Sequence, residues 1–245
     1  MKTEKYATVY GSPGTRVRLA GLLRTQWPLL IGVALTGYLI RAALPQPPIS
    51  IAIVGLLFLA LAIGIAAAAN HSRQRLQAFL KGAKGEEITA RELSLLPHTF
   101  TVFHGIAIAK PLKQQGANYD FDHIVVGANG IFLIETKNWA DEITIKDGEL
   151  LYGGQHPTRP PLDQVKSGAK NLSEFLFKQT GKKLEVRPIL CFASNNVPQG
   201  QQGAMGVLIC NATRLNETIT DCNDAPLTDA TRKETISILR KNSEI

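Results

Sequence analysis

The stretch DFDHIVVGANGIFLIETK, residues 120–137, contains the strongest folding signal in the chain. Two apolar, β-branched segments flank Asn129-Gly130. Asn-Gly between two such segments is the strongest short-range signal for a β-hairpin, because both residues tolerate the positive φ angles of a tight turn. The stretch therefore predicts two antiparallel strands, 119–126 and 131–137, which meet at this turn.

Two registers of this hairpin are open, and both bring charged side chains together. With Asn129-Gly130 as a two-residue turn, Asp122 lies opposite Lys137, and with a four-residue loop Asp122 lies opposite Glu135. In either register these three charged side chains share one face, because side chains alternate along a strand. They continue a row that is otherwise apolar.

Two carboxylates on neighbouring strands form a hard oxygen site of the kind that binds Mg²⁺ or Mn²⁺. Such an ion polarises a phosphate group and lowers the pKa of a bound water. Lys137 beside it would orient that water or neutralise charge that develops at the phosphate. The alternative is a solvated cross-strand Asp–Lys–Glu cluster that binds no ligand.

The patterns around the hairpin predict an α/β fold with a mixed sheet flanked by helices. Helices are expected over residues 72–96, 161–181 and 228–241, further strands over 99–108, 186–192 and 207–210, and a small hairpin over 142–152. Residues 1–15 are expected to form a loose tail, and the polar stretch 194–203 a loop.

Before this domain lie two apolar runs, residues 27–44 and the uncharged residues 49–69, separated by Pro45-Gln46-Pro47-Pro48. A helix rises about 1.5 Å per residue and a bilayer core is about 30 Å thick, so the second run is long enough to span it. We therefore expect a two-helix transmembrane hairpin that binds the lipid bilayer. It lacks an ionisable residue at its centre, which argues against a transporter or channel.

Charge distribution predicts the orientation of the chain. Lys and Arg flank both runs on their outer sides, so the positive-inside rule puts both ends in the cytoplasm. The expected organisation is a cytoplasmic tail (1–26), the hairpin (27–69) and a cytoplasmic domain (70–245) in a multi-pass protein of the cell (inner) membrane. Of the net charge of +7, most lies before residue 70. The high basic content is therefore no argument for nucleic-acid binding, and the three scattered cysteines form no disulfide scaffold or zinc motif.

Four motifs resemble a known family. KGAKGEE (81–87), FDHIVV (121–126), GIFLIETKN (130–138) and PLDQV (161–165) resemble the nuclease-related domain, NERD, over about residues 80–195. That family is assigned to the PD-(D/E)XK, restriction-endonuclease-like superfamily, and it often occurs in bacterial proteins with membrane spans. The resemblance thus implies a restriction-endonuclease-like mixed sheet and a bacterial origin.

The resemblance also implies residue roles. Asp122 resembles the metal-binding acid of the first motif, and Glu135 and Lys137 resemble the acid and lysine of E-x-K. Glu86 resembles the helical acid that completes or supports the metal site. Gln164 resembles a family glutamine near the substrate backbone.

One departure affects the substrate contacts: Pro160 stands where family members often have Asn. The implied activity is Mg²⁺- or Mn²⁺-dependent hydrolysis of phosphodiester bonds in nucleic acid, DNA being the expected substrate. The alternative is a non-catalytic module that binds nucleic acid or a protein on the same fold. His123, which alternates away from Asp122, is predicted to be a packed, hydrogen-bonded histidine, and Cys191 an inert buried thiol. The oligomeric state stays open.

Overall fold

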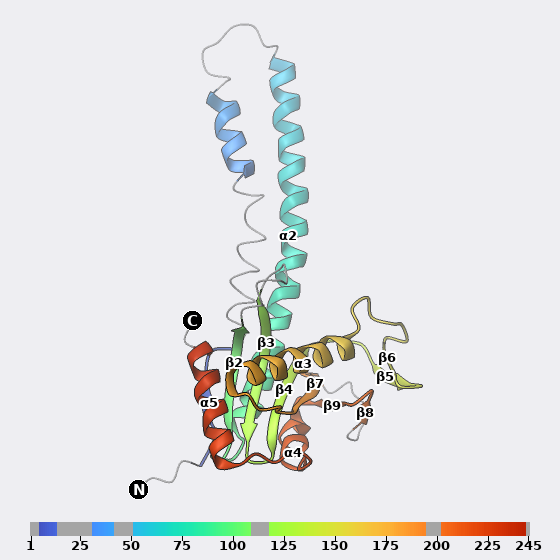
Figure 1. The fold of residues 1–245 in the computed structure, drawn as a ribbon. Coiled ribbons are helices and arrows are strands. Elements are labelled where there is room, and N and C mark those ends of the chain that lie inside the picture. The colour runs from blue at the N-terminus through green and yellow to red at the C-terminus, as the bar shows by residue number, and fades with distance from the viewer. Residues whose placement is uncertain (1–4, 14–30, 42–50, 109–117, 195–201, 244–245) are drawn as a thin grey trace. The chain divides into compact units, whose positions relative to one another are not determined.

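The computed structural model describes residues 5–13, 31–41, 51–108, 118–194 and 202–243 (Figure 1). The chain divides into two compact units. The larger comprises Met1–Thr15 and Gly82–Ile245, and the smaller comprises Arg16–Lys81. The larger unit therefore contains both the start of the chain and the predicted site.

A mixed sheet forms the centre of the larger unit, as the sequence predicts, and it has seven strands. Its strands, in spatial order, are β1 (Thr8–Tyr10), β2 (Thr101–Ile108), β3 (Tyr119–Gly127), β4 (Gly130–Lys137), β7 (Val186–Phe192), β9 (Val207–Asn211) and β8 (Gln202–Ala204). The pairs β2–β3, β3–β4 and β8–β9 are antiparallel, and the other pairs are parallel. A separate hairpin consists of β5 (Ile143–Lys146) and β6 (Glu149–Tyr152).

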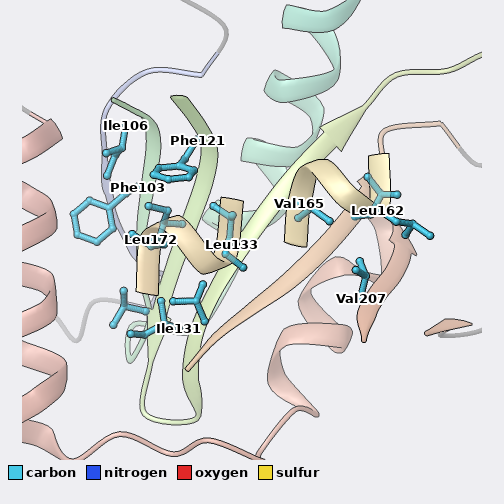
Figure 2. Close-up of a cluster of buried hydrophobic side chains, with 14 of the residues drawn as sticks. Phe103, Ile106, Phe121, Ile131, Leu133, Leu162, Val165, Leu172 and Val207 are labelled. Atoms are coloured by element: carbon cyan, nitrogen blue, oxygen red, sulfur yellow. The ribbon is translucent and has the colours of Figure 1, made fainter. Parts of the chain in front are cut away.

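Helices cover both faces of this sheet. The helical elements of this unit are the C-terminal part of α2 (Ile51–Ser94), α3 (Pro161–Thr180), η1 (Ala212–Arg214), α4 (Leu215–Thr220) and α5 (Asp229–Ser243). On one face, Leu172 of α3 packs with Leu133 of the sheet in an apolar cluster (Figure 2). Leu239 of α5 belongs to the same cluster. On the other, Leu93 of α2 and Ile219 of α4 pack in a second cluster. The result is a three-layer α/β/α arrangement.

The β3–β4 hairpin adopts the second of the two predicted registers. Gly127 pairs with Gly130 across a turn of Ala128 and Asn129. Asn129 Nδ2 donates to the carbonyl oxygens of Ile219 and Cys222, at 2.6 and 2.9 Å. The turn is therefore attached to the end of α4, a long-range contact that helps to fix the register.

Several elements differ from the sequence-based expectation. The prediction of a loose tail over residues 1–15 is wrong, because Thr8–Tyr10 form β1, which pairs with β2 at one edge of the sheet. The polar loop 194–203 includes the start of β8, and its residues 195–201 lie outside the described residues. The short α4 was not predicted. The other predicted strands, as well as α3 and α5, are confirmed, with ends that shift by a few residues. The helix predicted over residues 72–96 is part of the much longer α2, which begins at Ile51 and ends at Ser94.

The predicted transmembrane hairpin falls in the smaller unit. Residues 31–41 are helical, whereas 27–30, 42–44 and 49–50 lie outside the described residues. Among the helical residues that the structure describes, none forms a segment with the combined length and hydropathy needed to cross a membrane.

Strand β1 generates a first prediction. The ring of Tyr10 stacks on Phe103 with centroids 5.3 Å apart, and Arg240 of α5 lies 5.3 Å from the Tyr10 centroid. Such contacts contribute about 1–2 kcal/mol together. Tyr10→Ala should therefore lower the free energy of unfolding by about that amount in urea titrations. The exposed Val9 is the matched control, and Val9→Ala should change it by less than about 0.5 kcal/mol. Equal effects of both variants would contradict a stabilising role of the Tyr10 contacts.

Candidate functional site

The site lies where β3 and β4 separate. Their pairing runs from the turn to His123 and Ile134 and ends there. Beyond that point β3 remains paired with β2, and β4 remains paired with β7 as far as Lys137. The backbone N–H of Thr136 donates instead to Oδ2 of Asp122, at 2.8 Å. A side chain thus replaces the missing ladder bond, which fixes the Asp122 carboxyl between the two strands.

Next to Asp122, three polar side chains form a closed cluster. Nζ of Lys137 donates to Oε1 of Glu135 at 2.8 Å and to Oε1 of Gln164 at 2.9 Å. Nε2 of Gln164 donates to the same Glu135 oxygen at 2.6 Å. Glu135 and Lys137 are two residues apart on β4, so their side chains lie on the same side of the strand. Gln164 reaches them from the first turn of α3. Gln164 is exposed, so the cluster faces solvent on this side.

Glu86 approaches from α2, the helix on the opposite face of the sheet. Glu86 is only 9% exposed, and its charge raises the pKa of Asp122. The preceding residue, Gly85, packs against Asn138, which directly follows β4. The structure therefore brings the five predicted site residues into one region: Asp122 on β3, Glu135 and Lys137 on β4, Gln164 on α3 and Glu86 on α2.

The electrostatics of the site centre on Asp122. Burial raises the pKa of its carboxyl well above the ordinary value of 3.8, and the charges of Glu135 and Glu86 raise it further. The Thr136 N–H and the Lys137 ammonium oppose this shift of the pKa, but with smaller effects. Burial and the two neighbouring acids thus outweigh the Thr136 N–H and Lys137 in their effect on Asp122. An Asp122 carboxyl in these surroundings favours a proton or a cation beside it.

Oxygen donors of this type fit Mg²⁺ or Mn²⁺ by their chemistry. As arranged, however, no three or more His, Cys, Asp or Glu side chains within the described ranges gather closely enough to hold a metal ion. Glu135 Oε1 already accepts two hydrogen bonds. An ion at this position would therefore have to compete with Lys137 and Gln164 for that oxygen.

Two histidines lie near the site but outside it. His104 and His123 face each other across β2 and β3, with Nδ1 atoms 2.7 Å apart, and both are buried. Burial lowers the pKa of His104 to about 4 and that of His123 well below its ordinary value. The prediction of a packed, hydrogen-bonded His123 is therefore confirmed. Its partner His104 was missed, because only the β2–β3 register reveals it.

Two further features of the site escaped the sequence analysis. One is the hydrogen bond from Thr136 to Asp122, which depends on where the strands separate. The other is the close contact of Gly85 with Asn138. The sequence did offer one signal for the Gly85–Asn138 contact: Gly85 directly precedes the predicted site residue Glu86 within the same motif.

Fold and site together define a mixed α/β domain with an acidic site at the divergence of two strands. Residues 81–193 match the family model described as NERD, nuclease-related domain. The match includes all five site residues and confirms the resemblance found in the motifs.

An uncharacterized protein of Bacillus anthracis is 37% identical over 60 residues, which cover 24% of this chain and 27% of that protein. The chain therefore aligns with about a quarter of this relative's length. No solved structure matches the chain.

The raised pKa of Asp122 yields a second prediction. A carboxyl whose pKa rises on folding stabilises the folded state when it is protonated. Its contribution to the free energy of unfolding is complete below the ordinary pKa of 3.8. That contribution is lost as the pH rises through the raised pKa. Asp122→Asn mimics the protonated form. With chelator present, its free energy of unfolding should exceed that of the wild type at pH 7, and the difference should vanish as the pH falls toward 3.8.

Urea titrations between pH 4 and pH 8 measure this difference. The exposed Asp141 provides the control, since Asp141→Asn should show no comparable rise at neutral pH. A variant Asp122→Asn that is less stable than the wild type at pH 7 would show that the carboxylate is compensated in the folded state.

Proposed function

We propose that the chain is a metal-dependent nuclease-like enzyme that hydrolyses phosphodiester bonds, with DNA as its substrate. The observation that carries this proposal is the Asp122 carboxyl, buried between diverging strands beside two further acids and the Lys137–Glu135–Gln164 cluster. A restriction-endonuclease-like fold is part of the proposal. The match of residues 81–193 to the nuclease-related family model supports it.

In this proposal Asp122 and Glu135 hold Mg²⁺ or Mn²⁺, and Glu86 supports the same site. The bound ion would supply Lewis acidity toward the phosphate and lower the pKa of water. Lys137 lies within hydrogen-bond distance of Glu135 and would orient the attacking water or neutralise charge at the phosphate. Gln164, on the exposed side, would contact the substrate backbone.

A non-catalytic binding module on the same fold is the second candidate. Two observations favour it. Glu135 is already occupied by hydrogen bonds from Lys137 and Gln164. Residues 70–245 also carry 21 Lys and Arg against 19 acids, a small excess for a protein that binds long duplexes.

The decisive experiment is cleavage by the full-length chain in detergent. Supercoiled plasmid, single-stranded DNA and RNA would be incubated with Mg²⁺, Mn²⁺ or chelator. We expect metal-dependent cleavage that falls by about 10²–10³-fold in Lys137→Ala and is lost in Asp122→Asn, since each removes a group that acts on the reacting phosphate or its ion. Asp141→Asn, on the exposed surface, should cleave like the wild type.

The outcomes separate the two candidates. Binding of nucleic acid without cleavage at any concentration of either ion would favour the binding module. Cleavage that survives in both site variants would place the activity elsewhere. Cleavage of RNA alone would keep the site and change the substrate.

The proposal also places the chain on the cell (inner) membrane, as a multi-pass protein whose ends are cytoplasmic. Its support is the sequence: residues 49–69 carry no charge, residues 27–44 carry only Arg41, and basic residues flank the pair. The positive-inside rule then gives the orientation.

Extraction of membranes from expressing cells tests this anchor. The full chain should stay in the pellet after washing with alkaline carbonate and should enter solution only with detergent. Replacing Ile53, Leu56 and Leu59 by Lys should release it, because each charge at the centre of a span costs about 2.5–3.5 kcal/mol. Release of the unchanged chain by carbonate would refute the anchor.

A further inference from the structure

Two helices approach β4 at glycines. On α2, a Cβ atom at Gly85 would lie 2.7 Å from Cβ of Asn138, closer than side chains tolerate. Asn138 directly follows Lys137, whose carbonyl oxygen accepts a hydrogen bond of 2.9 Å from the N–H of Ala193. The end of β4 is thus fixed to the end of β7, and α2 reaches it because residue 85 has no side chain.

The second close approach lies on the other face of the sheet. On α3, a Cβ atom at Gly168 would lie 2.8 Å from Cδ2 of Leu133, a residue of β4 that is 3% exposed. Gly168 is one helical turn after Gln164, the residue that contacts Glu135 and Lys137. Gly85, in turn, directly precedes Glu86. Each glycine therefore lies within one helical turn of the site residue that its helix contributes.

We propose that Gly85 and Gly168 are positioning residues: their missing side chains let α2 and α3 close on opposite faces of β4, so that Glu86 and Gln164 reach the site. This inference rests on the proposed nuclease function. Alanine is a better helix former than glycine, so helix stability alone gives no reason for glycine at either position. The close contacts with β4 supply that reason.

Gly85 and Gly168 differ in how strictly the neighbouring atoms exclude a side chain. At Gly85 the opposing atom is a Cβ, which can move only with the backbone of Asn138. At Gly168 the opposing atom is the end of a leucine side chain, which can change rotamer. Gly82, one turn earlier on α2, has no atom within 4 Å of a built Cβ. It is therefore a matched control on the same helix.

The first test compares Gly85→Ala, Gly82→Ala, Asn138→Gly and the double variant Gly85→Ala with Asn138→Gly in the full-length chain. Mn²⁺ binding is followed by calorimetry and electron paramagnetic resonance, and thermal unfolding is recorded for each variant. Gly85→Ala should bind Mn²⁺ about 10–100-fold more weakly while keeping a cooperative unfolding transition. Plasmid cleavage should fall by about 10²-fold. The double variant should regain most of both, because Asn138→Gly removes the opposing Cβ.

Gly168→Ala covers the case in which Gly85→Ala does not fold. It should reduce cleavage less than Gly85→Ala, and Leu133→Val should restore it by removing the opposing Cδ atom. Wild-type Mn²⁺ affinity and cleavage in both Gly85→Ala and Gly168→Ala would overturn the inference and leave the proposed function intact. So would equal losses in Gly85→Ala and Gly82→Ala. A wild type that neither binds Mn²⁺ nor cleaves would overturn the proposed function, and the inference with it.

Discussion

The hydrogen bond from the Thr136 N–H to Asp122 is the constraint on which the site depends. A backbone donor buried without a partner is costly, and β4 loses its ladder partner on the β3 side where the two strands separate. A carboxyl group at this point satisfies the donor and ties the two strands together. The same bond holds an ionisable group in a buried place, so one interaction both completes the sheet and creates the acidic site.

Burying that group has an electrostatic consequence. The raised pKa of Asp122 reflects burial first and then the neighbouring Glu135 and Glu86. Lys137 opposes this shift of the pKa with a smaller effect, and Gln164 donates a second hydrogen bond to Glu135 Oε1 without adding a charge. A site that is electrostatically unfavourable in isolation is typical of functional positions, where stability is given up for the ability to bind a charged ligand.

Much of the fold could be predicted because its signals are local. The turn at Asn129, the alternation along β3 and β4 and the amphipathic pattern of α3 each lie within a short window. The choice of register could not be predicted in this way, because it depends in part on Asn129 reaching Ile219 and Cys222, about ninety residues later. Asp122, Glu135 and Lys137 were predicted from the alternation along the hairpin, and Glu86 and Gln164 from motif resemblance. The strand divergence that brings Asp122 to Thr136 has no sequence signal.

Strand β1 shows that a non-local strand pairing also determines which residues belong to the domain. The sequence of residues 1–15 has no strong strand pattern, yet Thr8–Tyr10 pair with β2, and Tyr10 contacts both Phe103 and Arg240. The larger unit is therefore discontinuous, with the segment Arg16–Lys81 inserted between its first strand and the rest. A fragment that begins after this segment would lack β1 and expose the edge of β2, a recognised cause of aggregation. Loss of activity in such a fragment would then reflect a damaged sheet rather than the chemistry of the site, which is why the full-length chain is the proper material for every functional test.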